Sequence, residues 1–155
     1  MGLLDRFKKQ KGQLSAPATG TLKPIETLAD GVFSEKMMGE GFIIENHNGE
    51  IYSPVSGVVQ SVFPTKHAVT IVSDEGVEVL LHIGLDTVEL QGQGFDVKVA
   101  ANDKVTKDTL LVTADIDYLK SQEKPTALVV VFPSNPELTF NEELEVEQGQ
   151  LLREL

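Results

Sequence analysis

Residues 67–83 read His67-Ala-Val-Thr-Ile-Val-Ser-Asp-Glu-Gly-Val-Glu-Val-Leu-Leu-His-Ile83, and this stretch decides the fold. Two runs rich in Val and Ile flank the tripeptide Asp74-Glu75-Gly76, whose composition is typical of a tight turn. The pattern therefore predicts two antiparallel strands joined as a hairpin. Pairing about the turn places His67 opposite Ile83, so the His67 and His82 imidazoles are expected to lie near each other.

The rest of the chain repeats this rhythm of short apolar runs separated by Gly, Pro, Asn and Asp. Further strands are expected at residues 41–46, 57–63, 109–114, 127–132 and 144–146, and short helical turns only at 87–90 and 116–122. Many short strands with frequent turns are typical of an all-β fold, either an antiparallel β-sandwich or a partly closed barrel.

Composition narrows the function classes. The chain of 155 residues has a formal charge of −11 and contains no Cys. Strong acidity argues against nucleic acid as a partner, because a phosphate backbone needs a basic face. The lack of Cys excludes disulfides, thiol nucleophiles and cysteine-ligated metal centres. Because neither a membrane-spanning run nor a secretory signal is visible, we expect a cytoplasmic protein.

The first eleven residues, MGLLDRFKKQK, differ from the remainder. They hold four of the 13 basic residues and one of the 24 acidic ones, which leaves nine cations, 23 acids and a charge of −14 on residues 12–155. Leu3, Leu4 and Phe7 fall at helical spacing, so residues 2–11 predict either weak contact with the inner face of an anionic membrane or an ordinary solvated tail.

Residues 12–20 are small and polar, which predicts a flexible linker. The expected organisation is an amphipathic segment with its linker at residues 1–19, followed by a single domain at residues 20–155.

The three histidines are the candidate reactive groups. His47 lies in the turn-like sequence Asn46-His-Asn-Gly49 and is expected to be an exposed loop residue. His67 and His82 belong to the predicted hairpin. A neutral imidazole can take a phosphoryl group on one nitrogen when an acceptor holds the proton on the other. The same pair could instead bind zinc, with a carboxylate or water completing the coordination, or form a polar rim of the sheet.

Four stretches of sequence carry a family resemblance: Val32-Phe-Ser-Glu-Lys36, Ser53-Pro-Val-Ser-Gly57, Phe63-Pro-Thr-Lys-His-Ala68 and Val79-Leu-Leu-His-Ile-Gly-Leu-Asp-Thr-Val-Glu-Leu-Gln-Gly-Gln-Gly-Phe95. Together they resemble the glucose-type enzyme IIA of the bacterial sugar phosphotransferase system, and the last stretch is the most specific. The likeness extends more loosely over nearly the whole chain.

The resemblance implies an antiparallel β-sandwich of the duplicated hybrid motif kind, with little helix. It also implies a phosphotransferase component that requires no cofactor. Such a phosphocarrier takes a phosphoryl group from the phosphohistidine of the carrier protein HPr and passes it to a cysteine of the IIB domain of a sugar permease. Members of the family also regulate other proteins by binding them, so regulatory targets are a further expectation.

By match to the family motif, His82 is the phosphorylated residue and His67 is the partner that steadies the phosphoryl group. The other expected site residues position these imidazoles or act on their charge: Thr65, Gly84, Asp86 and, more weakly, Asp30. Thr65 would orient His67, and a carbonyl such as that of Gly84 would hold the Nδ1 proton of His82 and leave Nε2 free to attack.

A docking surface for protein partners should be apolar around a shallow depression. Its candidates, each of which could equally be a core residue, are Val32, Phe33, Met37, Met38, Phe63 and Leu80. Position 80 departs from the aromatic residue expected in close relatives. The acidic domain suits a basic HPr surface through electrostatic steering.

Two other functions were weighed against the phosphocarrier. A zinc hydrolase would need a third protein ligand beside His67 and His82, and neither a His-x-His nor a His-Glu-x-x-His pattern occurs. A biotinyl or lipoyl carrier would present a lysine such as Lys36, beside Met37, at a hairpin tip. The chain is about twice the size that such a module needs.

Overall fold

The computed structural model describes residues 12–155. Apart from one α-helix and two short 3₁₀ helices (η), its elements are strands. In chain order they are β1 (Gln13–Ser15), β2 (Gly20–Pro24), η1 (Ile25–Leu28), β3 (Glu40–Glu45), β4 (Glu50–Tyr52), β5 (Gly57–Val62), β6 (Ala68–Ser73), β7 (Glu78–Ile83), η2 (Thr87–Leu90), β8 (Phe95–Val97), β9 (Lys104–Val105), β10 (Leu110–Ala114), α2 (Ile116–Ser121), β11 (Leu128–Phe132), β12 (Leu144–Val146) and β13 (Leu151–Glu154).

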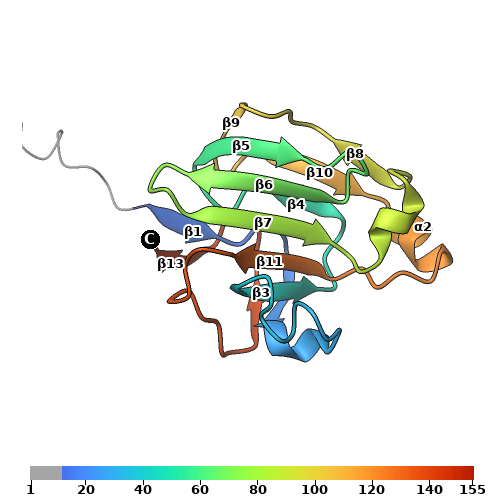
Figure 1. Ribbon diagram of the computed structural model, residues 1–155, viewed down its shortest axis with the longest axis horizontal. Helices are drawn as coiled ribbons and strands as arrows, with labels where there is room; N and C mark the ends of the chain where they lie inside the picture. Colours follow the sequence, from blue (N-terminus) through green and yellow to red (C-terminus); the bar gives the residue numbers. More distant parts are fainter. Residues whose placement is uncertain (1–11) are drawn as a thin grey trace, which may run out of the picture.

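The strands form two packed layers. An eight-stranded sheet in the order β12-β2-β3-β11-β7-β6-β5-β9 makes one layer, and the three-stranded sheet β4-β10-β8 lies behind it in Figure 1. The end strands β1 and β13 pair separately with each other. All pairings between the described strands are antiparallel. The predicted all-β antiparallel sandwich is therefore confirmed.

The hairpin of β6 and β7 has the predicted register. Ala68 pairs with His82, and the His67 carbonyl accepts a hydrogen bond from the Ile83 N–H at 2.8 Å. The turn closes where Asp74-Glu75-Gly76 predicted it. Gly76 has a φ of +88°, a backbone conformation that residues with a side chain rarely adopt.

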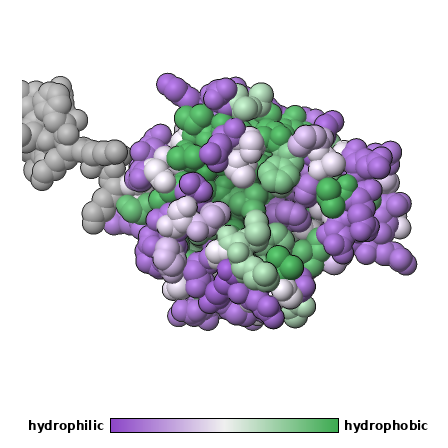
Figure 2. Space-filling view, in the orientation of Figure 1, coloured by the Kyte–Doolittle hydropathy of each residue, from purple (hydrophilic) through white to green (hydrophobic). Residues whose placement is uncertain are grey.

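Alternation along β7 divides its side chains between two apolar clusters. Leu81 and Ile83 point into the main core between the two sheets. Leu80 belongs to a smaller cluster on the outer face of the large sheet, together with Ile25, Phe33, Ile43, Ala68, Val129 and Val131. Because side chains two apart share a face, His82 also lies on this outer face. Figure 2 shows hydrophobic residues gathered across the middle of the face that looks toward the viewer in Figure 1, with hydrophilic residues around them.

The domain begins earlier than the sequence predicted, so the expectation of a linker at residues 12–20 is corrected. Leu14, Ala16 and Ala18 are fully buried in the main core. The N–H of Ala16 donates to the carbonyl of Gln150 at 2.8 Å, next to the pairing of β1 with β13. Small residues here permit close packing against the C-terminal strand rather than chain flexibility. The amphipathic segment predicted for residues 2–11 lies outside the described residues.

Other differences concern short elements. The strands that the sequence did not predict, β1, β2, β4, β8, β9 and β13, have two to five residues each, and all of them except β1 include Gly, Pro or charged residues. They are too short to show an apolar run, and pairing with long neighbours holds them in place. The predicted helical turns at residues 87–90 and 116–122 correspond to η2 and α2, whereas η1 was not predicted. Among the described residues, no helix has the length and apolar character needed to cross a bilayer.

Candidate functional site

Two imidazoles meet on the outer face of the large sheet. His82 is the penultimate residue of β7, and His67 directly precedes β6. Their ring centroids lie 4.8 Å apart and the ring planes are nearly perpendicular, at 83°. The hairpin register produces this meeting, since the His67 carbonyl is bonded to the residue that follows His82.

One nitrogen of His82 is held by the backbone. Nδ1 lies 2.8 Å from the carbonyl oxygen of Gly84. A carbonyl only accepts hydrogen bonds, so Nδ1 carries the proton and Nε2 keeps its lone pair. The bond requires a turn in which Gly84 has a φ of +75°, and a Cβ at this position would lie 2.6 Å from the carbonyl oxygen of Pro125. Only glycine fits there without displacing the backbone.

His67 is oriented by its own turn. Its Nδ1 lies 2.8 Å from Oγ1 of Thr65, and either group can donate, depending on the tautomer. Between them, Lys66 adopts a left-handed conformation with a φ of +62°, which bends the chain so that both side chains face the same way. The ring of Phe63 packs edge-on against His67, at 5.6 Å between centroids.

Burial keeps the two imidazoles neutral. Burial first, and then the proximity of His67, lowers the pKa of His82 to about 4, although the hydrogen bond to Gly84 and the charges of Asp30 and Asp86 oppose both effects. Burial also lowers the pKa of His67, against the opposing hydrogen bond with Thr65. At neutral pH, His82 is therefore an uncharged base with an available nitrogen lone pair.

The two predicted carboxylates have different settings. The carboxylate of Asp30 accepts hydrogen bonds from the backbone N–H groups of Val32, Phe33 and Ser34, at 3.2, 3.1 and 2.8 Å. Burial raises the pKa of Asp30, but these hydrogen bonds outweigh it and the pKa lies below its ordinary value. Asp86 is exposed, and it precedes η2 with a φ of +56°.

A shallow cavity of about 430 Å³ joins these groups. His82 and both carboxylates line it, together with Val32, Phe33, Leu85 and Val88. The cavity holds one nucleophilic nitrogen, apolar walls and two negative charges. A small group carried on a partner protein could therefore reach Nε2 here.

The six residues predicted for the docking surface fall into two groups. Four are exposed: Val32, Met37, Met38 and Phe63. The other two, Phe33 and Leu80, are only 8% and 7% exposed and belong to the outer apolar cluster. Phe33 still contacts the site, because its ring centroid lies 5.1 Å from that of His82. Sequence reasoning missed Val88, which is half exposed at the rim of the cavity.

The prediction of an exposed His47 was wrong. His47 does lie in a turn, between β3 and β4, but its side chain is only 6% exposed. Its Nε2 lies 2.7 Å from the carbonyl oxygen of Thr126, and its Nδ1 accepts from the Gly49 N–H at 3.1 Å. Turn composition reports the backbone conformation but does not show which segment packs over the turn.

The residues that the structure describes do not gather into a metal-binding group. Within residues 12–155, no group of three or more His, Asp or Glu side chains is placed to hold a metal ion. The zinc hydrolase considered from the sequence needs three protein ligands, which this part of the chain does not bring together.

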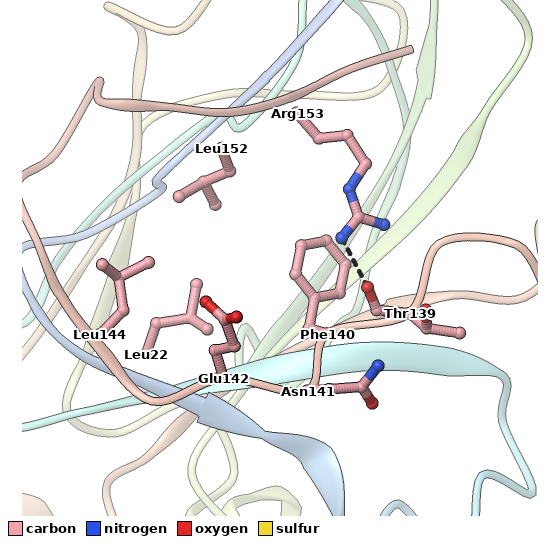
Figure 3. A pocket seen from close by; sticks show the side chains of 8 residues that line it. All are labelled: Leu22, Thr139, Phe140, Asn141, Glu142, Leu144, Leu152 and Arg153. Atoms are coloured by element: carbon pink, nitrogen blue, oxygen red, sulfur yellow. Dashed lines mark hydrogen bonds between the residues drawn. The ribbon is translucent and has the colours of Figure 1, made fainter.

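A second hollow of about 300 Å³ lies between the end of β13 and residues 139–144 (Figure 3). Its one cation, Arg153, donates to the carbonyl of Thr139 at 2.6 Å and lies 4.2 Å above the ring of Phe140. These contacts pack β13 against the loop before β12. Since no imidazole lines this hollow, the histidine pair marks the candidate site.

Comparisons with known proteins identify the family of the chain. The family described as the phosphoenolpyruvate-dependent sugar phosphotransferase system, EIIA 1, matches residues 12–138. A curated relative, the "PTS system glucose-specific EIICBA component" of Streptococcus pneumoniae serotype 4, is 51% identical over 126 residues, which are 81% of this chain. The chain spans only 17% of that relative's length.

A solved structure, the glucose permease IIA from Mycoplasma capricolum, superposes with a TM-score of 0.84 and 35% identity. The match covers 98% of this chain and 97% of that one. The sequence match and the fold thus agree over almost the whole described domain. This chain belongs to the EIIA 1 family of the phosphoenolpyruvate-dependent sugar phosphotransferase system.

Proposed function

We propose that this chain is a phosphocarrier that accepts a phosphoryl group on Nε2 of His82 from the phosphohistidine of HPr. It then passes the group to a cysteine of the IIB domain of a glucose-type permease. The observation that carries the proposal is the hydrogen bond of 2.8 Å between His82 Nδ1 and the Gly84 carbonyl. This bond fixes the tautomer in which Nε2 is the nucleophile.

The proposed transfer uses only the donor phosphohistidine, His82 and the IIB cysteine. The Nε2 lone pair of His82 attacks the phosphorus, the N–P bond of the donor breaks, and its electron pair returns to the donor imidazole. The Nδ1 proton of His82 stays in place, and its bond to Gly84 strengthens as the ring gains positive character. In the second step the IIB cysteine thiolate attacks the same phosphorus, and Nε2 recovers its lone pair.

His67 is proposed to steady the transferring group. Its ring lies 4.8 Å from that of His82, so a proton on His67 Nε2 can reach a phosphoryl oxygen while Thr65 holds Nδ1. Phosphoryl transfer depends mainly on positioning and charge stabilisation, which one hydrogen-bond donor at this place supplies. The pKa of His67 lies below its ordinary value in the free protein, and the arriving phosphoryl charge would favour its protonated form.

The exposed apolar side chains around the cavity are proposed as the surface for HPr and the IIB domain. Val32 lines the cavity beside His82, Phe63 packs against His67, and Met38 is exposed on the same loop as Val32. Burying such apolar side chains supplies non-directional affinity. Two different partners can use one such face because Met and Phe side chains adapt to different shapes. Other regulatory proteins would compete for the same face.

We propose that the chain acts in the cytoplasm, where HPr presents its phosphohistidine and the IIB domain presents its acceptor cysteine. Weak contact of residues 2–11 with an anionic membrane would raise its concentration near the permease.

The decisive experiment incubates the protein with phosphoenolpyruvate, enzyme I and HPr, and then measures intact mass and maps the modified peptide. One acid-labile phosphate is expected on the peptide that contains His82. The His82→Ala variant should remain unphosphorylated, and Ser53→Ala, which removes a buried hydrogen bond away from the cavity, serves as the control. Normal labelling of His82→Ala would overturn the assignment.

A further inference from the structure

His47 forms a buried hydrogen-bonded connection to the site although it does not line the cavity. Its Nδ1 accepts from the Gly49 N–H at 3.1 Å, so Nε2 must carry the proton of the neutral ring. That proton is donated to the Thr126 carbonyl at 2.7 Å. Burial lowers the pKa of His47, and the hydrogen bond to Thr126 opposes this effect only in part. His47 is thus a neutral imidazole with both nitrogens paired.

The segment that His47 holds also supports the turn after His82. The carbonyl of Ala127 accepts from the Gly84 N–H at 2.8 Å, and the carbonyl of Pro125 accepts from the Leu85 N–H at 3.2 Å. Thr126 lies between these two acceptors. The Gly84 turn therefore rests on residues 125–127, and His47 holds the middle residue of that support.

Close contacts restrict how far residues 125–127 can move relative to the Gly84 turn. Residues 125–127 enter β11, whose Val129 pairs with His82. A Cβ on Gly84 would lie 2.6 Å from the Pro125 oxygen, so the two segments are already in close contact. A shift of residues 125–127 would therefore move the Gly84 peptide and the carbonyl that fixes the His82 tautomer.

We propose that His47 is a positioning residue for phosphoryl transfer: by holding the Thr126 carbonyl, it fixes the Gly84 turn that keeps His82 in its Nδ1–H tautomer. The part of this proposal that concerns phosphoryl transfer rests on the proposed function. The part that concerns the His82 tautomer does not. His47 does not touch the phosphoryl group. Its contribution is geometric, and it passes through residues 125–127 to the Gly84 turn.

Two substitutions separate the two hydrogen bonds of His47. His47→Gln places an amide N–H where Nε2 lies, so it keeps the bond to Thr126 and loses the acceptor for Gly49. His47→Asn places an amide oxygen where Nδ1 lies, so it keeps the acceptor for Gly49 and cannot reach Thr126. Both variants lose one buried hydrogen bond and the same ring.

A control variant removes a comparable bond away from the site. Ser53 is fully buried after β4, and its hydroxyl donates to the Val55 carbonyl at 2.6 Å. Ser53→Ala measures the effect of lost stability alone, since it leaves the contacts of residues 125–127 intact.

Three readouts and one measurement of stability test the proposal on the full chain. Imidazole ¹⁵N NMR reports the tautomer of His82 in the unphosphorylated protein. Amide hydrogen exchange reports the Gly84 and Leu85 N–H groups. Single-turnover uptake from phospho-HPr reports the rate, and urea unfolding gives the stability of each variant.

We expect His47→Asn to lose the pure Nδ1–H signature, to exchange the Gly84 amide faster, and to take up phosphate about tenfold more slowly. His47→Gln should keep the wild-type tautomer and a rate within about twofold, as should Ser53→Ala. Unchanged His82 spectra in folded His47→Asn would overturn the proposal. So would equal losses in both His47 variants that follow their unfolding free energies.

If His47→Asn does not fold, His47→Gln decides alone, because loss of the tautomer in that folded variant contradicts the proposed route through Thr126. The outcome is separable from the proposed function. If the His82 tautomer follows the Thr126 bond but phospho-HPr fails to phosphorylate His82, the positioning role is supported and the phosphocarrier function is refuted.

Discussion

The two nitrogens of His82 have different surroundings, which is the basis of its proposed reactivity. Nδ1 is bound to the Gly84 carbonyl, whereas Nε2 faces the cavity and the ring of His67. Burial among Phe33 and its neighbours removes water that would stabilise the charged ring, so His82 stays neutral over a wide pH range. The Gly84 carbonyl thus sets the tautomer, and burial together with the nearby His67 sets the charge.

The low pKa of His82 predicts how uptake depends on pH. Only the neutral ring has a lone pair on Nε2, so the rate of phosphoryl uptake should be nearly constant from about pH 8 to pH 5. It should then fall as the pH drops through about 4. Stopped reactions with phospho-HPr at each pH, corrected for hydrolysis of the donor, measure the rate, and NMR titration of the His82 ring is the control. A midpoint near pH 6.5, in both the uptake rate and the NMR titration, would contradict the role of burial.

His67 should matter more for releasing the phosphoryl group than for receiving it. His67→Gln keeps a hydrogen-bond donor near the Nε2 position but cannot become a cation. We expect uptake on His82 within a few-fold of normal and transfer to the IIB cysteine slower by about 100-fold or more. Intact mass of both proteins over time measures the two steps. Onward transfer at the wild-type rate would remove His67 from the mechanism.

At the scale of elements, the loop between η1 and β3 links the site to the proposed docking surface. Its Asp30 gathers three backbone N–H groups, its Phe33 fills the outer apolar cluster, and its Met37 side chain is 70% exposed. Lys36, at the tip with a φ of +61°, forms ion pairs with Glu26 and Glu40 on either side of the loop. These contacts make the loop a structured platform, and they assign Lys36 a structural role.

Removing the carboxylate of Asp30 should loosen this platform. Asp30→Ala leaves the Val32, Phe33 and Ser34 N–H groups without their acceptor, which should lower the free energy of unfolding by about 1–2 kcal/mol. Weaker binding of HPr should accompany this loss. Asp30→Asn, which keeps one acceptor oxygen and removes the charge, is the matched control and should retain most of the stability. Equal stability of the Ala variant and the wild type in urea would refute the capping role.

At the scale of the whole molecule, a large excess of acidic residues is combined with one apolar face of the large sheet. Residues 12–155 carry nine cations and 23 acids, while the outer apolar cluster and the exposed residues beside it lie on one face of the large sheet. An acidic surface attracts a basic partner at long range, and the apolar face holds it at short range. In the proposed function, net charge thus affects the rate of association, and the apolar face affects the docked complex.

This division predicts a salt-dependent association rate. Raising the ionic strength from about 0.05 M to 0.5 M should slow second-order transfer from HPr by about tenfold, because screening shortens the range of attraction. Hydrolysis of the phosphorylated chain alone, a first-order reaction, should change little and serves as the control. A second-order rate that is independent of salt would show that charge does not steer the encounter.

Local sequence pattern is enough to specify the hairpin and the residues at its ends. Alternating Val and Ile runs around Asp74-Glu75-Gly76 specify the register, since a slip by one residue would turn Leu81 and Ile83 out of the core. The meeting of His67 and His82 follows from that register. Local pattern sufficed here because the interacting groups are joined by one short turn.

Only the tertiary structure decided what packs against the hairpin. The burial of Leu14 and Ala16 against the C-terminal strand, and the bond from His47 to Thr126, join residues far apart in the chain. Small residues and turn residues look alike in sequence whether they are solvated or covered. Which of these happens depends on long-range contacts that create burial, and burial in turn sets the pKa of His82.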